Sequence, residues 1–153
     1  MSKAKTVPFS NTLLVRDACL CLHLQRAARA VARRFDDAFR HLGLTNGQFS
    51  LLMSLNRPEP PTITSVAALL AMDRTTLTAN LKPLERRGLL TVSVDSADKR
   101  SRRLSLTDDG RDLLADAVPI WKREHAALDR LLAKPSRKGS GPDLLRDDLQ
   151  ALS

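Results

Sequence analysis

Positively charged side chains gather in one short segment, residues 95 to 110, which reads DSADKRSRRLSLTDDG. An arginine on a loop can enter a narrow minor groove of DNA, where the negative potential is enhanced. Asp98 precedes Arg100 by two positions, so its carboxylate can hold the guanidinium by a charge-assisted hydrogen bond. Lys99 and Arg102 add positive charge to the same loop. The segment therefore predicts a contact with nucleic acid through Asp98, Lys99, Arg100 and Arg102.

The whole chain shares this positive character. Its 153 residues carry a formal net charge of +8, which favours a polyanionic partner, although some basic proteins bind no nucleic acid. A hydrophobic content of 42% is enough to bury a core, and the length suits one domain with helical extensions. No apolar run approaches the roughly 18 residues of a membrane helix. We therefore expect a cytoplasmic protein without a membrane partner.

The residue types that serve enzymes and metal sites lack the necessary spacing. Cys19 and Cys21 lie two positions apart, which on a helix turns their side chains about 200° away from each other. His23, His41 and His125 have no CxxC or HxxxH partner, so no metal site is expected. A hydrolase built around His23 or His125 would lack a nucleophile at suitable spacing. With no glycine-rich phosphate loop either, we expect neither an enzyme nor a cofactor.

Helices must position the charged segment. Apolar residues recur at helical spacing over residues 11–41, which predicts one long helix. Thr45 and Gln48 have the spacing of a capping box and open a short helix that ends before the prolines at 58–61. A very short strand at 62–63 is then expected, with Thr64 or Ser65 as the cap of the following helix.

The next elements combine into a recognisable motif. Asp73 is placed to cap a helix over 74–87, which Gly88 ends. Two short helices joined by a tight turn indicate a helix-turn-helix. Residues 89–94 and 102–106 alternate as β-strands do, so the charged segment is the loop of a hairpin. A helix-turn-helix followed by a hairpin is a winged helix, whose second helix enters the major groove while the wing reaches the flanking backbone or minor groove.

The C-terminal part is again helical. Thr107 is expected to cap a long helix that reaches about Ala133 and bends at Pro119. A linker over 134–142 separates it from a last short helix with leucines at 144, 145, 149 and 152. That helix is too short and too apolar on one face to be stable alone. It is expected to pack on the first helix of its own or of a partner chain.

Two stretches carry a resemblance to a known family. Residues 72–90, MDRTTLTANLKPLERRGLL, and the following DSADKRSRRLSLTDDG resemble the recognition helix and wing of MarR-family transcriptional regulators. The resemblance implies a homodimer whose terminal helices interlock and whose two winged helices read a pseudo-palindromic operator. We therefore expect a mainly α fold with a small β-hairpin. We expect the chain to divide into an N-terminal dimerisation helix (1–44), a winged helix-turn-helix domain (45–106) and C-terminal dimerisation helices (107–153).

The resemblance also assigns roles to residues of the recognition helix. Five positions in its first half match family positions near DNA, and their side chains suit base-edge and phosphate contacts. They are Arg74, Thr75, Thr76, Thr78 and Asn80. Simple surface residues of a helix would look similar, so the assignment is an expectation. Further phosphate contacts are expected from Lys82, Arg86, Arg87, Arg102 and Arg103.

The cysteines leave two interpretations open. LCLHLQRAARAV, residues 20–31, resembles the first helix of the peroxide-sensing branch of the family, and Cys21 lies where that branch has its reactive cysteine. That branch supports its thiolate with tyrosine hydroxyls, whereas this chain has no tyrosine. A basic neighbour would then have to activate the thiol. The other interpretation makes Cys19 and Cys21 small buried hydrophobes.

These expectations combine into one function. The sequence predicts a homodimeric repressor that occludes a promoter at an inverted repeat in double-stranded DNA. Release would follow binding of a small-molecule effector or oxidation at Cys21, either of which changes the spacing of the two recognition helices. The alternative is a winged-helix module for protein interaction, which would bind DNA weakly and without salt dependence.

Overall fold

The computed structural model describes residues 5–133 and 141–152, which fold into seven α-helices, one short 3₁₀ helix and one two-stranded sheet. The predicted fold class, mainly α with a small β-hairpin, is confirmed. The helices α1 to α3 comprise Phe9–Ala18, Leu20–Phe39 and Asn46–Ser54, with the 3₁₀ helix η1 at Arg40–Leu42 before α3. The predicted linker over 134–142 lies largely outside the described residues, and its last position, Pro142, already belongs to a helix.

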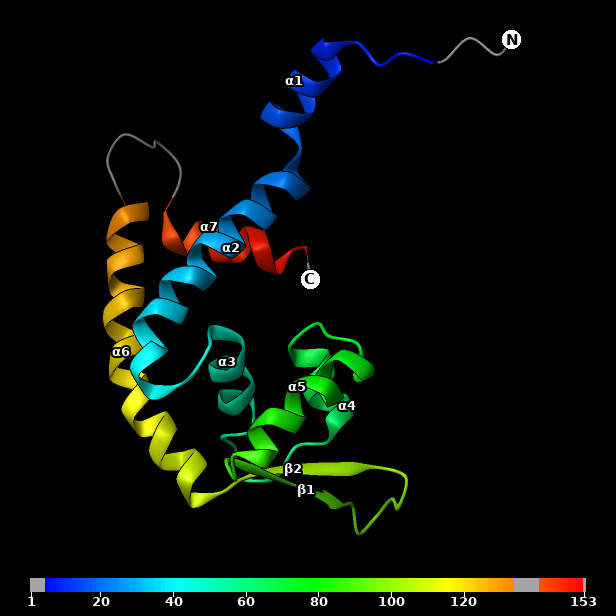
Figure 1. Ribbon diagram of the computed structural model, residues 1–153, viewed down its shortest axis with the longest axis vertical. Coiled ribbons are helices and arrows are strands. Elements are labelled where there is room, and N and C mark those ends of the chain that lie inside the picture. The colour runs from blue at the N-terminus through cyan, green and yellow to red at the C-terminus, as the bar shows by residue number, and fades with distance from the viewer. Residues whose placement is uncertain (1–4, 134–140, 153) are drawn as a thin grey trace.

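The predicted long helix over 11–41 is wrong, because Cys19 adopts an extended backbone (φ −73°, ψ 106°) and divides it into α1 and α2. The ring of His23 lies close to the break, with its Nε2 3.2 Å from the carbonyl oxygen of Asp17. In Figure 1, α1 extends away from the rest of the chain. Within the described residues, α1 contributes no buried side chain.

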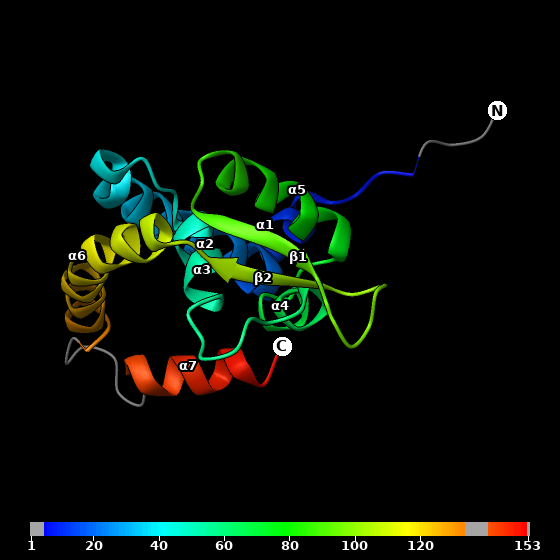
Figure 2. The same cartoon turned by 90° about the horizontal axis from the view of Figure 1, so that it is seen from below.

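The winged helix follows in the predicted order. The helices α4 (Ile63–Leu69) and α5 (Arg74–Arg86) precede the strands β1 (Leu90–Val94) and β2 (Arg102–Leu106). The strands pair antiparallel, with Leu90 opposite Leu106 and Val94 opposite Arg102. The loop that joins them projects from the edge of the molecule opposite α6 (Asp108–Leu132) (Figures 1 and 2). The charged segment of the sequence is therefore an exposed wing.

Local signals set most helix boundaries. The Thr45–Gln48 capping box forms in both directions, and the Asp73 carboxylate accepts the Thr76 N–H as the cap of α5. Gly88 has φ +71°, a conformation that favours glycine, and ends α5. The cap expected at Thr64 or Ser65 is wrong, because Thr62 accepts the Ser65 N–H and the helix begins at residue 63. The very short strand expected at 62–63 is reduced to an isolated β-bridge between Thr62 and Arg103, because residue 63 already belongs to α4.

The core joins the winged helix to the two longest helices. Phe39 of α2 is fully buried and stacks on Phe49 of α3, with ring centroids 4.9 Å apart. Leu77 and Leu84 of α5 and Leu104 of β2 are also fully buried. The first half of α6 adds Leu114, Ala117 and Ile120. The winged helix thus shares one continuous core with the end of α2 and the start of α6.

The last helix, α7 (Pro142–Gln150), is attached by polar contacts to α6. The Arg146 guanidinium donates to the Asp129 carboxylate of α6 at 2.5 Å, while the leucines of α7 stay largely exposed. Across residues 5–133 and 141–152, the helices are too short or too polar to cross a membrane. The division of the chain into segments 1–44, 45–106 and 107–153 stays a prediction.

Candidate DNA-binding site

The helix α5 presents a polar face opposite its buried one. Leu77, Leu81 and Leu84 are buried at helical spacing, and at about 100° per residue the opposite side of the helix is easily found. Its positions are Thr75, Thr78, Ala79, Lys82 and Arg86, all of them exposed. The face combines hydroxyls, a methyl group and two cations. Such a surface fits a groove lined by base edges and phosphates.

The five predicted recognition residues are all exposed but differ in direction. Arg74 and Thr75 form the first turn of α5. Thr76 is committed to the cap, because its N–H and hydroxyl donate to the Asp73 carboxylate at 2.8 and 2.6 Å. Both bonds lower the pKa of Asp73, the hydroxyl bond being the larger cause. The hydroxyl of Thr78 donates to the Arg74 carbonyl at 2.7 Å, which leaves its methyl group and the lone pairs of its oxygen for a ligand.

Asn80 faces another element. Its amide nitrogen lies 3.8 Å from the Met72 sulfur, and the side chain lines a small cavity of about 190 Å³ shared with Thr45 and Gln48 of the α3 start. Ala79, which the prediction omitted, lies on the outward side instead. The leucine spacing 77, 81, 84 carried the signal that could have found it, because that spacing alone fixes the opposite face of the helix.

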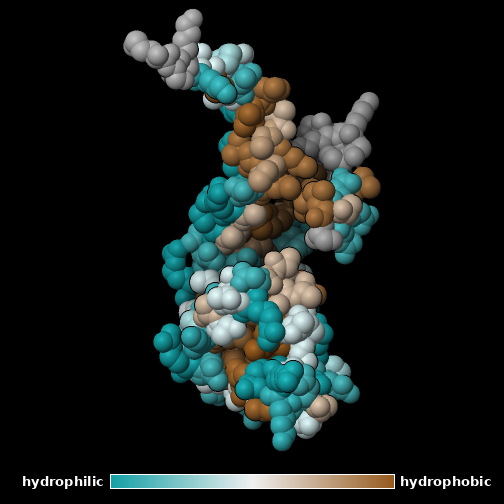
Figure 3. Space-filling model, turned by 90° about the vertical axis from the view of Figure 1, so that its right-hand side faces the viewer, coloured by the Kyte–Doolittle hydropathy of each residue, from teal (hydrophilic) through white to brown (hydrophobic). Residues whose placement is uncertain are grey.

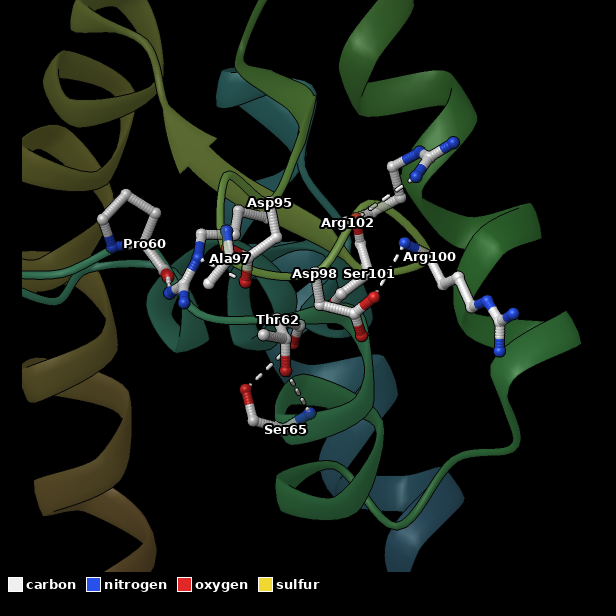
Figure 4. A network of polar contacts seen from close by, with 10 residues as sticks. Pro60, Thr62, Ser65, Asp95, Ala97, Asp98, Arg100, Ser101 and Arg102 are labelled. Atoms are coloured by element: carbon white, nitrogen blue, oxygen red, sulfur yellow. Dashed lines mark hydrogen bonds and ion pairs between the residues drawn. The ribbon is translucent and has the colours of Figure 1, made fainter.

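The turn of the wing is formed by hydrogen bonds among its own residues. The Asp98 carboxylate accepts the Arg100 N–H at 2.9 Å, and the Asp98 carbonyl accepts the Ser101 N–H at 2.8 Å. The sequence predicted instead that Asp98 would hold the Arg100 guanidinium. Asp98 shapes the turn, while the exposed side chain of Arg100 extends away from it (Figure 4). Arg100 thus stands at the wing as a projecting cation.

The other two predicted wing residues flank Arg100. Lys99 is exposed, and its carbonyl accepts a hydrogen bond at 3.1 Å from the guanidinium of Arg102. The same guanidinium donates to the Ser101 carbonyl at 3.2 Å (Figure 4). The structure therefore brings Asp98, Lys99, Arg100 and Arg102 together in one loop.

A partly buried ion pair, which the sequence did not reveal, lies at the base of the wing. Asp95 is only 5% exposed, and its carboxylate accepts the Arg103 Nε–H at 2.9 Å and the Ala97 N–H at 2.9 Å. The Ala97 bond is the largest cause that lowers the pKa of Asp95, and the positive charge of Arg103 lowers it further. Arg103, expected among the phosphate contacts, thus has a partner inside the protein.

A cavity of about 520 Å³ lies between α3, α4 and α6. Its walls are mainly apolar, and one cation stands among them. The lining residues are Phe49, Ser50, Met53, Ser54, Leu69, Leu70, Val118, Trp121 and Lys122. The ring of Trp121 stacks at 6.4 Å on Phe49 and lies 4.6 Å from His125. A pocket of this size and lining suits a small molecule with an aromatic or apolar body.

The two cysteines lie at the junction of α1 and α2. Cys21 is exposed in the single chain, and its sulfur accepts a hydrogen bond from the Gln25 amide at 3.2 Å. Cys19 is half-buried at the helix break. Within the part of the chain that the structure describes, no three His, Cys, Asp or Glu side chains gather as a metal site would require.

The arrangement defines a class of protein. A helix-turn-helix presents an exposed polar face on its second helix, and the adjoining hairpin carries a projecting arginine. Both belong to one core. These are the elements of a winged-helix DNA-binding protein.

Comparison with known proteins narrows this class. The model of the MarR family matches residues 44–101. The organic hydroperoxide resistance transcriptional regulator of Bacillus subtilis is 34% identical over 101 residues, which cover 66% of this chain and 69% of that protein. The chain belongs to the MarR family. It is accordingly a DNA-binding transcriptional regulator, and its relatives are regulators rather than enzymes.

Solved structures of related regulators agree. The regulator MosR of Mycobacterium tuberculosis in complex with DNA is 36% identical, with a TM-score of 0.73 over 87% of this chain and 92% of that chain. The transcriptional repressor CouR bound to a 23-mer DNA duplex is 30% identical, with a TM-score of 0.76 over 97% and 99%. CouR is also known bound to p-coumaroyl-CoA, in a structure with a TM-score of 0.73 over 87% and 90% at 30% identity.

Proposed function

We propose that this regulator is a homodimeric repressor of a pseudo-palindromic operator, released by a small-molecule ligand. The observation that carries the proposal is a lobe, residues 35–120, in which the exposed polar face of α5 and the projecting wing belong to one core. Two such lobes, held about 34 Å apart by a dimer, would meet successive major grooves on one side of the duplex. A bound repressor would then cover the promoter.

The DNA contacts divide by type. In the recognition helix Arg74, Thr75 and Thr78 face the major groove, with Thr76 and Asn80 at the sides of the contact. In the wing, Arg100 enters the minor groove, and Lys99 and Arg102 meet phosphates beside it. Asp98 supports the wing through the Arg100 N–H. Base contacts would give specificity, and phosphate contacts would give affinity that falls steeply with salt.

The partner that completes the terminal helices is a second copy of this chain. Phe9 and Leu14 of α1 are 72% and 64% exposed, and Leu152 beyond α7 is 61% exposed. Hydrophobic side chains gather over this upper half of the molecule in Figure 3. Apolar surface of this extent is unfavourable in water and suits an interface. A symmetric dimer also matches the symmetry of an inverted repeat.

The cavity beside Trp121 is the proposed effector site. Its apolar walls and the single ammonium of Lys122 suit an aromatic body with an anionic group. The structural relative CouR binds p-coumaroyl-CoA, a ligand of that kind. The cavity lies between α3 and α4 on one side and α6 on the other. A ligand that fits only one relative placement of these helices would change the spacing of the two lobes.

Oxidation at Cys21 is a second route of release. The thiol is exposed in the single chain and accepts a hydrogen bond from Gln25, and the chain resembles a regulator of organic hydroperoxide resistance. It lies in the first turn of α2, directly after the break that separates α2 from α1, the helix of the proposed interface. A sulfenic acid or a mixed disulfide at this position would alter the packing there.

Selection from random duplexes tests the DNA-binding part. Wild-type protein is expected to enrich an inverted repeat, and its affinity is expected to fall with rising salt. Arg100→Ala is expected to lose about tenfold in affinity. Failure to enrich any repeat, together with an unchanged Arg100→Ala variant, would favour the protein-interaction module instead.

Fluorescence tests the effector part, because Trp121 is the single tryptophan of the chain. Titration with p-coumaric acid and its CoA thioester is expected to change the emission and to release the operator. Lys122→Met is expected to weaken binding of these anions, while cinnamyl alcohol serves as the uncharged control. Release by cumene hydroperoxide, measured in Cys21→Ser beside wild type, separates the two routes. Loss of that release only in the variant would assign it to Cys21.

A further inference from the structure

The guanidinium of Arg103 connects the wing to a distant loop. Its Nε donates to the Asp95 carboxylate at 2.9 Å, and its Nη1 donates to the Pro60 carbonyl at 2.7 Å. Asp95 directly follows β1, and Pro60 lies in the segment between α3 and α4. Figure 4 shows Pro60 and Asp95 near each other at the base of the wing. One side chain therefore bridges two segments that the backbone connects only indirectly.

The loop that receives Arg103 is well suited to act as a fixed support. Prolines at 58, 60 and 61 restrict its backbone angles. The Leu104 N–H donates to the Pro61 carbonyl at 2.9 Å, and Thr62 and Arg103 form an isolated antiparallel bridge. The backbone of β2 and the side chain of Arg103 thus both attach the hairpin to residues 60–62.

The wing is assembled outward from this anchor. Asp95 is 5% exposed and its N–H donates to the Ser101 carbonyl at 3.1 Å, which closes the base of the loop. The Asp98 carboxylate then fixes the Arg100 N–H at 2.9 Å. The direction of Arg100 therefore depends on a chain of contacts that begins at Asp95 and Arg103.

We propose that Arg103 is a positioning residue, which holds the wing at the angle at which Arg100 meets DNA. This inference rests on the proposed role of the wing as a DNA contact. Arg103 donates from Nε to a carboxylate of one segment and from Nη1 to a carbonyl of another, so its guanidinium is held between the end of β1 and the proline loop. Asp95 shares the role, since a buried carboxylate at that place keeps the guanidinium bound.

A double-mutant cycle on the selected operator tests the inference. Arg103→Gln is expected to lower affinity about tenfold in the wild-type background, but less than about twofold in the Arg100→Ala background, because the wing then has nothing to position. The dependence of log affinity on log salt is expected to keep its slope. Arg102→Gln is the matched comparison, for which loss of a phosphate contact lowers that slope by about one.

Two further variants separate positioning from charge. Arg103→Lys keeps the cation but loses the planar fork that reaches two acceptors, so affinity is expected to fall as in Arg103→Gln. Asp95→Asn removes a negative charge, which by electrostatics alone would raise affinity for DNA. Positioning requires that it lower affinity instead. Melting temperatures of all variants verify that the lobe is folded.

The outcomes are distinct. A reduced salt slope in Arg103→Gln, full affinity in Arg103→Lys, or additive losses with Arg100→Ala would overturn the inference and make Arg103 a phosphate contact. A gain of affinity in Asp95→Asn would also overturn it. If Arg100→Ala itself binds like wild type, the proposed role of the wing fails, and the positioning role fails with it.

Discussion

The winged-helix lobe and the terminal helices differ in how much of themselves they bury. The buried apolar residues of the core all lie between Phe35 and Ile120. Within the described residues, α1 and α7 contribute none to it, and Phe9 of α1 is 72% exposed. The lobe satisfies its apolar side chains within one chain, and the terminal helices do not.

The helix caps repeat the same difference. The helices α3, α4, α5 and α6 begin in the lobe, and each has a side-chain N-cap. The capping residues are Thr45, Thr62, Asp73 and Thr107. In the described chain, α1, α2 and α7 have Pro8, Cys19 and Gly141 at their N-cap positions, and none of these residues makes a side-chain capping bond. Helices with neither caps nor buried faces are marginal in isolation. The comparison suggests that the lobe folds by its own contacts, while the terminal helices depend on the second copy proposed above.

The largest expected effect on stability comes from replacing a phenylalanine in each region. Phe39→Ala is expected to lower the free energy of unfolding by about 3–5 kcal/mol, because it opens a cavity beside Phe49. Phe9→Ala is expected to leave the unfolding of the lobe unchanged and to weaken only dimer formation. Urea titration at several protein concentrations measures both effects. Equal losses in the two variants would mean that α1 belongs to the core of the lobe.

Two glycines give the next test. A Cβ on Gly110 would lie 2.0 Å from the Leu89 carbonyl oxygen, whereas a Cβ on Gly141 would have no non-neighbouring atom of the described residues within 4 Å. Gly110→Ala is therefore expected to cost about 1–3 kcal/mol or more through overpacking. Gly141→Ala is expected to affect only the start of α7. Thermal unfolding followed by circular dichroism compares them, and an unchanged melting temperature in Gly110→Ala would contradict the close approach.

Local sequence signals predicted the lobe better than the terminal helices. The caps at Thr45, Asp73 and Thr107 and the stop at Gly88 act over three or four residues, so the sequence reveals them directly. The break at Cys19 depends on one backbone angle, which the unbroken apolar spacing does not report. The His23 ring lies near the break, but its approach to the Asp17 carbonyl leaves no trace in the spacing of apolar residues.

The site shows the same limit. The sequence placed Asp98 and Arg100 in one loop, but not the bond of the carboxylate to the backbone N–H. It could not reveal that Arg103 contacts Pro60, because the two residues are 43 positions apart and meet only through the packing of a loop against the hairpin. Spacing predicts which residues share an element. It does not predict which side chains cross between elements.

A helix cap gives a smaller test of the comparison. Thr45→Ala removes the hydroxyl that accepts the Gln48 N–H at 3.2 Å, and is expected to cost about 1 kcal/mol. Thr45→Ser keeps an acceptor and serves as the control. Urea titration measures the loss. The helix α7 has no side-chain cap and buries no residue. Gly141→Ser, which can add a cap to α7, is therefore expected to leave the unfolding of the lobe unchanged.

The smallest expected effect concerns pH. The pKa of Asp73 is lowered by the Thr76 hydroxyl and N–H, and that of Asp17 in α1 is lowered chiefly by its bond to Arg16. A carboxyl with a lowered pKa in the folded state stabilises the protein above its unfolded pKa of 3.8. As pH falls below 3.8, the unfolded chain binds the proton more readily than the folded chain does. The stabilising contribution is therefore lost progressively until the pH has passed the lower pKa of the folded state.

The two carboxyls are expected to differ in how they report this loss. Asp73→Asn retains a cap, so its unfolding midpoint is expected to depend less on pH than that of wild type between about pH 5 and pH 3. About 1 M salt leaves that difference in place, because neutral donors lower the pKa of Asp73, whereas it screens the exposed pair of Asp17 and Arg16. Asp17→Asn is expected to leave the midpoint of the lobe unchanged at every pH. A shift as large as that of Asp73→Asn would mean that α1 unfolds together with the lobe, and the two regions would then form one cooperative unit.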